Sequence, residues 1–199
     1  MRPLTYYVGT SLDGRIAGPE GEVDVYPLSD DHLEHMTAEY PEVLPTHARR
    51  RLGIDDAGNR RFDTVVMGSG TYQPALEIGV TDPYEHLRTY VASTRDDLPQ
   101  DPAVTIVADP LALVRQLKAE DDASAIWLAG GGRIAATLVD EIDQLILKVY
   151  PVLLGDGVPV LAGAFSPRAF TLVASASFAS GCTVLTYERN DTAGGDHQA

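Results

Sequence analysis

The sequence predicts a single α/β domain in which helices pack against a mainly parallel sheet. Short apolar runs typical of buried strands alternate with amphipathic stretches typical of helices along most of the 199 residues. This alternation favours a parallel sheet in a layered fold, because parallel strands need crossover connections. The last two strand-like runs meet near Ser180 and Gly181 and indicate a closing hairpin.

The strands are expected where β-branched and apolar residues cluster between turn residues. They are predicted at 4–9, 64–67, 87–93, 104–107, 125–128, 144–154, 170–177 and 183–189. Residues 11–28 contain several glycines and prolines and are expected to form a long loop.

The helices are expected between these strands, and some have recognisable first residues. Ser29 can cap one helix, and Asp109 followed by Pro110 can begin another. The predicted helices cover 30–40, 45–51, about 71–78, 110–117 and 134–139. We expect His32, His35 and the run Arg49–Arg51 to lie on helix surfaces, since the histidines lack the spacing of a zinc-protease motif.

Composition restricts the partners of this domain. The formal net charge of -14 argues against binding to nucleic acid or to anionic membranes, which are polyanions. The single cysteine, Cys182, fits a reducing cytoplasmic compartment, and no signal peptide or run of roughly 18 apolar residues is visible. The domain is expected to span 1–189, and 190–199 to form a mobile tail, since its only apolar residues are alanines.

The clearest functional motif is a glycine turn between a predicted strand and a predicted helix. Gly130, Gly131 and Gly132 follow the strand, and Arg133 opens the helix. Bare glycines let the backbone approach a ligand closely, and the first N–H groups of a helix attract an anion. The turn therefore predicts a phosphate-binding site for a nucleotide-like ligand, although glycine-rich turns also occur for packing alone.

Two further motifs follow predicted strands, and the first of them would lie at the same edge of the sheet as the glycine turn. Gly68, Ser69 and Thr71 can form a second helix-start anion site, or a tight turn with a threonine cap. Ser93, Thr94 and Arg95 can grip another phosphate through hydroxyl and guanidinium groups, or form a solvated loop.

The remaining candidates are acidic and apolar residues near the same edge. In the loop after the first strand, Ile16 can cover a ligand while Asp13 or Ser11 makes a polar contact; alternatively, Asp13 and Gly14 form a simple turn. Asp30 and Asp31 open the first helix, where they serve its dipole or, alternatively, supply a proton at the ligand site.

The order of these motifs resembles the dihydrofolate reductase-like superfamily, and most closely the reductase domain of bacterial riboflavin biosynthesis and its stand-alone relatives. The motifs that carry the resemblance are Ser11–Ala17, Met67–Tyr72, Ser93–Arg95, Gly130–Gly132, Val139–Ile142 and Pro151–Gly157. The resemblance covers about residues 4–189. It implies a three-layer α/β/α fold, a mostly parallel sheet of about eight strands with an antiparallel C-terminal strand, NADPH as hydride donor, and a homodimer.

The resemblance also assigns roles by position. Gly131 and Gly132 would hold the pyrophosphate and nicotinamide side, Gly68, Ser69 and Thr71 the other phosphate side, and Ser93, Thr94 and Arg95 the adenosine 2′-phosphate. Asp13 and Ile16 would face the nicotinamide and substrate. Ser69 stands where dihydrofolate reductases often have arginine, Tyr7 where the riboflavin enzymes have lysine, and the cysteines of a deaminase half are absent.

These observations lead to two hypotheses. The first is an NADPH-dependent reductase that delivers a hydride to a C=N or C=O bond of a small heterocyclic or sugar-like substrate. Its proton would come from Asp13, Asp30, Asp31 or water, with Asp13 favoured, and the donor carboxyl would need a raised pKa. The second is a non-catalytic, regulatory nucleotide-binding protein on the same scaffold.

Overall fold

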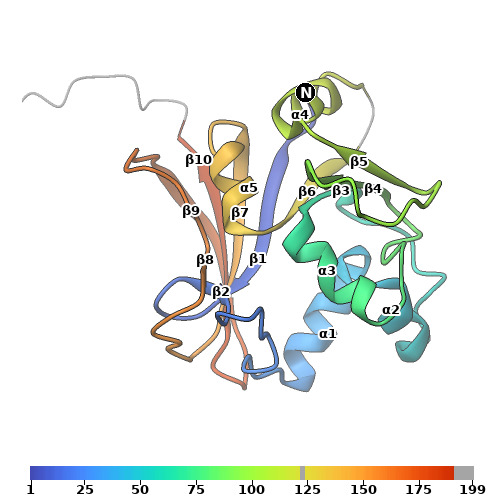
Figure 1. The fold of residues 1–199 in the computed structure, drawn as a ribbon. Helices are drawn as coiled ribbons and strands as arrows, with labels where there is room; N and C mark the ends of the chain where they lie inside the picture. Colours follow the sequence, from blue (N-terminus) through green and yellow to red (C-terminus); the bar gives the residue numbers. More distant parts are fainter. Residues whose placement is uncertain (122–123, 191–199) are drawn as a thin grey trace, which may run out of the picture.

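An eight-stranded sheet forms the centre of the molecule (Figure 1). The computed structural model describes residues 1–121 and 124–190. The strand order is β5-β4-β3-β6-β1-β7-β10-β9, and the first six strands run parallel to one another. The strands are β1 (Leu4–Thr10), β3 (Phe62–Gly68), β4 (Arg88–Ala92), β5 (Val104–Val107), β6 (Ala125–Gly130), β7 (Ile142–Val149), β9 (Phe170–Ser177) and β10 (Thr183–Arg189).

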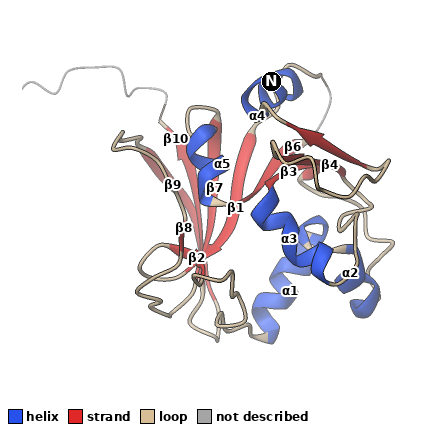
Figure 2. Ribbon diagram, in the orientation of Figure 1, coloured by secondary structure: helices blue, strands red, loops and turns tan. Residues whose placement is uncertain are grey.

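Helices cover both faces of this sheet (Figure 2). They are α1 (Asp30–Glu39), the 3-10 turn η1 (Pro41–Val43), α2 (Thr46–Leu52), α3 (Ser69–Glu77), α4 (Pro110–Lys118) and α5 (Gly132–Thr137). Met36 of α1 and Tyr72 of α3 are buried in one core, and Val114 of α4 and Ile134 of α5 in a second core. The predicted three-layer fold is therefore confirmed.

The closing strands are antiparallel, as the sequence predicts. β10 runs antiparallel to β7 and pairs with β9, which forms the edge of the sheet. The predicted bounds of β9 and β10 match the structure.

Several boundaries differ from the predicted ones. β7 begins at Ile142 and ends at Val149, because Tyr150 and Pro151 begin a loop. α3 begins at Ser69, two residues earlier than expected, and continues through Pro74. The expected 11–28 loop contains β2 (Arg15–Ala17), which pairs with β8 (Val158–Pro159) in a small separate sheet. Of the expected tail, only Asn190 is described, and 191–199 lie outside the described residues.

Two residues expected on the surface are buried. His32 lies on the inner face of α1, one turn before Met36. Arg49 is also buried, and its guanidinium donates hydrogen bonds to the backbone carbonyls of Asp55 and Ala57. Its charge thus organises the loop after α2, because each buried donor needs an acceptor.

In the described parts of the chain, no helix has the length and apolar character to cross a membrane.

Candidate functional site

The ends of β3 and β6 and the start of α3 meet at one corner of the molecule. A Cβ built on Gly68 would lie 3.8 Å from the carbonyl oxygen of Gly130 and from the amide nitrogen of Gly131. A Cβ on Gly130 would lie 3.4 Å from Thr71 Oγ1 and 3.9 Å from Ile16 Cδ1. The structure thus brings together Ile16, Gly68, Thr71, Gly130 and Gly131 from three separate segments, and we call them the glycine corner.

Backbone conformation explains the glycine at position 130. Gly130 has φ of +125°, which residues with a side chain rarely adopt. Gly131 has φ of −92°, an ordinary value, so only space and not conformation favours glycine there. The peptide bond between them is cis.

The first N–H groups of α3, which starts at the glycine corner, have no side-chain cap. Gly68 is the N-cap of α3 and Ser69 its first residue, and no side chain caps this end. By contrast, Asp109 Oδ1 accepts a hydrogen bond from the amide of Ala112 at the start of α4. The uncapped N–H groups of α3 are suited to an anion, because helix N-termini carry partial positive charge.

Gly132 has a different role from the two glycines before it. A Cβ on Gly132 would collide with the carbonyl oxygen of Pro159 in β8, and the carbonyl of Gly132 accepts a hydrogen bond from the amide of Ala162 at 3.0 Å. Packing against β8 therefore requires glycine here, independently of any ligand. Arg133, the next residue, is exposed on α5.

The carboxylate of Asp13 holds together two loops. It accepts hydrogen bonds from Ser11 Oγ at 2.6 Å and from the amides of Leu154 and Gly155 at 3.0 and 2.7 Å. The hydrogen bond from Ser11, followed by the two amides, lowers the pKa of Asp13 to about 2. This is the opposite of the raised pKa that a proton donor needs, so the structure does not support that role for Asp13.

The acidic pair on α1 is also explained by local structure. Asp31 accepts hydrogen bonds from Ser29 Oγ and from the amides of His32 and Ala179, both at 2.9 Å. The Ser29 hydrogen bond is the main cause that lowers the pKa of Asp31. Asp31 therefore ties α1 to the β9–β10 turn as a carboxylate, and Asp30 is exposed in the first helical turn.

The predicted 2′-phosphate group of residues follows β4. The amide of Arg95 donates to Ser93 Oγ at 3.1 Å, and the guanidinium makes two hydrogen bonds with Asp97 at 2.7 and 2.8 Å. Thr94 beside them is exposed. Since the side chains of Arg95 and Asp97 are both more than half exposed, their ion pair is weak and a ligand phosphate can compete with Asp97.

Sequence reasoning placed the two histidines of α1 on the surface and missed their packing against the β9–β10 turn. His32 is fully buried against the ring of Phe178, with centroids 4.7 Å apart, and no protein group hydrogen-bonds either ring nitrogen in the described structure. His35, one turn further, contacts Phe178 and Tyr40. Burial is the main cause that lowers the pKa of His32 to about 4, so its ring is neutral at pH 7.

The neighbouring residue Lys148 of β7 was missed as well. Its Nζ lies 4.6 Å from the ring centroid of Tyr7. Burial lowers the pKa of Lys148 to about 8. One signal was available in the sequence: Lys148 is one of only two lysines, and it interrupts the apolar run 144–154.

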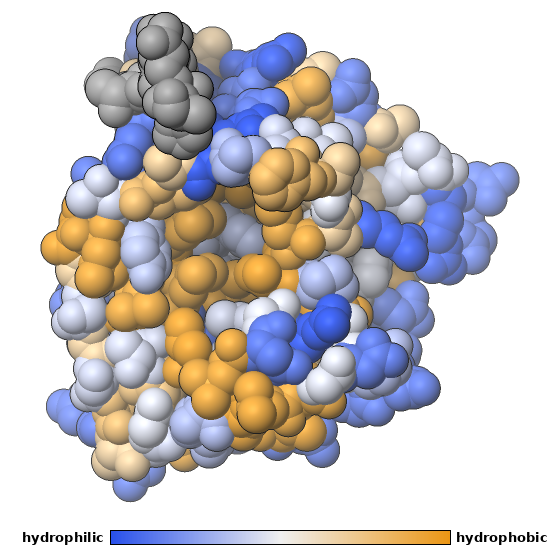
Figure 3. All heavy atoms as spheres, turned by 90° about the vertical axis from the view of Figure 1, so that its left-hand side faces the viewer, coloured by the Kyte–Doolittle hydropathy of each residue, from blue (hydrophilic) through white to orange (hydrophobic). Residues whose placement is uncertain are grey.

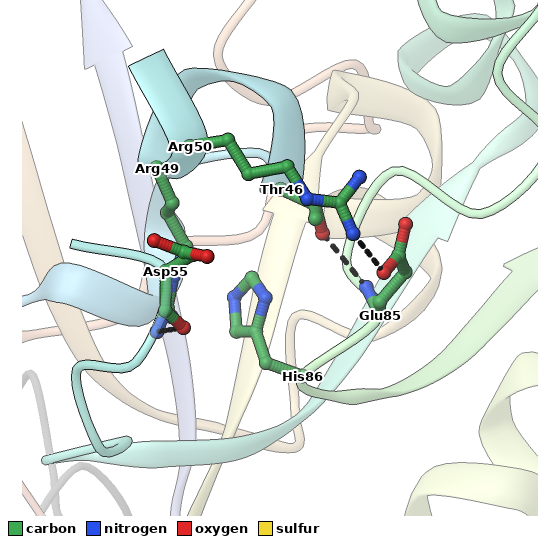
Figure 4. Close-up of a pocket in the computed structure, with 6 residues that line it drawn as sticks. All are labelled: Thr46, Arg49, Arg50, Asp55, Glu85 and His86. Carbon is green, nitrogen blue, oxygen red and sulfur yellow. Dashed lines mark hydrogen bonds and ion pairs between the residues drawn. The ribbon is translucent and has the colours of Figure 1, made fainter. Parts of the chain in front are cut away.

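A separate polar cavity of about 200 Å³ lies beside α2 (Figure 4). Arg50 and Glu85 form an ion pair at 2.6 Å in its wall, and the amide of Glu85 donates to Thr46 Oγ1. The cavity is lined by Thr46, Arg49, Arg50, Asp55, Glu85 and His86. None of these residues belongs to the glycine corner, so this cavity is not part of the predicted nucleotide site.

Comparison with known proteins gives a consistent set of relatives. YwjB of Bacillus subtilis (strain 168), an uncharacterized protein, is 28% identical over 162 residues, which cover 80% of this chain and 82% of YwjB. A protein assigned to riboflavin biosynthesis from Shewanella sp. PV-4 superposes with a TM-score of 0.71 and 25% identity, over 96% of this chain and 99% of that one.

A third comparison concerns the fold. Dihydrofolate reductase from Enterococcus faecalis, solved with NADP(H) and the compound RAB-propyl, superposes with a TM-score of 0.63, over 95% of this chain and 97% of that enzyme. At 17% identity, this likeness concerns the fold alone. The model of the RibD C-terminal domain matches residues 2–184. The chain, with its glycine corner at the end of β6, therefore belongs to the family of RibD C-terminal domains.

Proposed function

We propose that this protein is an NADPH-dependent reductase that delivers a hydride to a C=N or C=O bond of a small heterocyclic or sugar-like molecule. The glycine corner is the observation that carries the proposal. It combines a backbone conformation at 130 that residues with a side chain rarely adopt, a position at 131 where a Cβ would make only ordinary contacts, and the uncapped start of α3. Family membership and the NADP(H) complex of the dihydrofolate reductase relative support the same ligand class.

The residues of the glycine corner fit such a cofactor. Gly130 and Gly131 would let it approach the backbone, Ile16 would shield its ring from water, and Thr71 with the first amides of α3 would hold phosphate oxygens. Bound there, a nicotinamide supplies a hydride, and the protein supplies position and exclusion of water.

Two measurements test this function. Calorimetry is expected to detect NADPH binding, and absorbance at 340 nm is expected to fall when pterins, pyrimidinones or quinoid compounds are added with NADPH. Binding without oxidation across the panel would favour the regulatory alternative. Flat binding heats with both NADPH and NADH would overturn the proposal.

Arg95 is expected to determine the preference for NADPH over NADH. Replacing Arg95 with alanine removes the guanidinium that would contact the 2′-phosphate, so NADPH binding should weaken about tenfold or more while NADH binding stays nearly constant. Asp97→Asn should have the opposite effect, because it removes the ion pair of Arg95 with Asp97 and leaves the guanidinium free for the 2′-phosphate. This variant should bind NADPH more tightly relative to NADH than the wild type does. If calorimetry shows that Arg95→Ala loses affinity for NADPH and NADH equally, Arg95 does not determine the preference.

We also propose a homodimer that forms through the sheet face beside α5. Leu147 of β7 pairs with Leu185 of β10, and Tyr187 of β10 lies between Leu145 of β7 and Leu172 of β9. These residues share one face, and none is fully buried. Apolar side chains gather around a hollow on the side of the molecule where β8 and β9 lie (Figure 3).

A second copy of the chain suits this face for reasons of charge. Two molecules that each carry a formal net charge of -14 repel one another least when they meet through an uncharged surface. β9 and the turn that leads from it to β10 contain no charged residue. A two-fold contact is self-complementary, so the same apolar face of both copies would meet.

The dimer is tested by light scattering after size exclusion. The wild type is expected at twice the chain mass, and Leu172→Glu as a monomer, because the variant sets two carboxylates close together in the contact. Ile78→Glu is the control, since Ile78 is similarly exposed but follows α3. A monomeric wild type, or a dimeric Leu172→Glu, would rule out this contact.

A further inference from the structure

Lys148 is an unusual cation in this chain. Among the described residues, no carboxylate or carbonyl accepts a hydrogen bond from its Nζ, although the sequence contains 29 acidic residues. The other lysine, Lys118, pairs with Asp143 at 2.8 Å and donates to the carbonyl of Glu141 at 2.9 Å. Lys148 is partly buried, and the Tyr7 ring is the neighbour that its ammonium faces, so the ammonium is free to meet a ligand that carries a hydrogen-bond acceptor.

The position of Lys148 relates it to the glycine corner. Lys148 pairs in register with Gly9 on β1, and a Cβ on Gly9 would lie 3.8 Å from Lys148 Cε and too close to the ring of Tyr150. Gly9 therefore makes room for both side chains. The ammonium lies over Tyr7, so the side chain extends from β7 across β1. β6, which ends at Gly130, is the other neighbour of β1, about 10 Å from β7.

The groups around Lys148 keep their protonation state near pH 8. From α1, His32 is neutral, and the charge of Lys148 contributes to its lowered pKa. Burial raises the pKa of Cys182, next to β10, to about 11, and raises the phenol pKa values of Tyr7 and Tyr150. Lys148 is thus the member of this group whose charge changes between pH 7 and 9.

We propose that Lys148 contacts the substrate at the bond that is reduced and donates the proton that completes the reduction. This inference rests on the proposed reductase function. The carbon of the C=N or C=O bond gains the hydride with its electron pair, and the π electrons move to the nitrogen or oxygen. That atom takes a proton from the ammonium, the dinucleotide is left oxidised, and water reprotonates the neutral amine of Lys148.

This assignment also accounts for the tyrosine at position 7. The riboflavin enzymes that the sequence resembles have lysine at that position of the first strand, and here the ammonium of Lys148 lies directly over the Tyr7 ring. In this chain the cation beside that ring comes from the adjacent strand, β7.

The first test needs no substrate turnover. The chain contains two lysines, so reductive methylation with ¹³C-formaldehyde gives two lysine signals in NMR, and Lys148→Arg assigns them. Lys148 is expected to titrate near pH 8 and to shift when pterin or 5,6-diaminouracil is added with NADP⁺; Lys118, on the other face, serves as the internal control. A Lys148 signal that titrates with that of Lys118 and ignores both compounds would overturn the proposal.

The second test separates proton donation from simple attraction. For whichever compound of the panel is reduced, kcat/KM of the wild type should fall as pH rises through 8, because only protonated Lys148 can donate. Lys148→Arg keeps the positive charge, but a guanidinium does not release its proton near pH 8. For this variant kcat should therefore fall about 100-fold or more with little change in KM. Lys148→Met should lose both kcat and substrate affinity.

The outcomes distinguish this inference from the function on which it rests. If Lys148→Met binds NADPH as the wild type does but has lost the reductase activity, the result supports both the role of Lys148 and the reductase function. A variant that reduces the compound as fast as the wild type overturns the role of Lys148 and leaves the reductase function intact. Absence of nucleotide binding in the wild type overturns the function, whatever the lysine signals show.

Discussion

Replacing Gly131 with alanine is expected to weaken NADPH binding at least about tenfold, or ~1.4 kcal/mol, with little effect on folding. The new methyl group would lie 3.7 Å from Ile16 Cδ1 and from Thr71 Oγ1, an ordinary contact that the folded protein can accommodate. The backbone at Gly131 has φ of −92°, which alanine adopts freely. The methyl group therefore fills only the space that we assign to the cofactor.

Two comparisons make this prediction specific. Gly58→Ala adds a methyl group where nothing lies within 4 Å, and it should change neither stability nor binding. Gly130→Ala should reduce both the stability of the fold and the affinity for NADPH, because φ of +125° is strained for alanine. Calorimetry with NADPH and urea unfolding measure the two effects separately, and unchanged NADPH affinity in Gly131→Ala would mean that the glycine corner does not hold the cofactor.

The elements that sequence reasoning located correctly depend on local patterns. Asp109 and Pro110 start α4 as predicted, because capping involves only neighbouring residues. The hairpin strands 170–177 and 183–189 were found with their bounds. The glycine corner was also predictable, since parallel strands place their carboxyl ends at one edge.

The errors concern residues whose environment comes from distant parts of the chain. Asp13 was favoured as proton donor, but its pKa is set partly by the amides of Leu154 and Gly155, some 140 residues away. His32 has the polarity of a surface residue, and its burial depends on Phe178 of the β9–β10 turn. No local pattern contains these contacts, so side-chain roles were less predictable than the fold.

Glu42→Ala is expected to destabilise the protein by about 3 kcal/mol, because it removes a buried carboxylate that organises the start of β3. Glu42 is fully buried in η1. Its Oε1 accepts hydrogen bonds from the amides of Arg61 and Phe62 at 2.7 and 2.9 Å, and its Oε2 from the amide of Arg60 at 3.2 Å. Alanine leaves these three donors without their acceptor; Phe62 is buried, and a buried donor without a partner costs about 1–3 kcal/mol.

Glu39→Ala is the matched control for this change. Glu39 forms an ion pair with the side chain of Arg61 at 2.7 Å, but both groups are about half exposed, so its loss should cost under about 1 kcal/mol. Glu42→Gln should lie between the two alanine variants, since the amide keeps one acceptor oxygen but sets an NH₂ group against a backbone donor. Equal urea midpoints for Glu39→Ala and Glu42→Ala would show that burial of Glu42 does not stabilise β3. A large loss of stability in Glu42→Ala alone would show that the carboxylate in η1 stabilises β3. Since β3 ends at Gly68, this carboxylate would then also support the glycine corner.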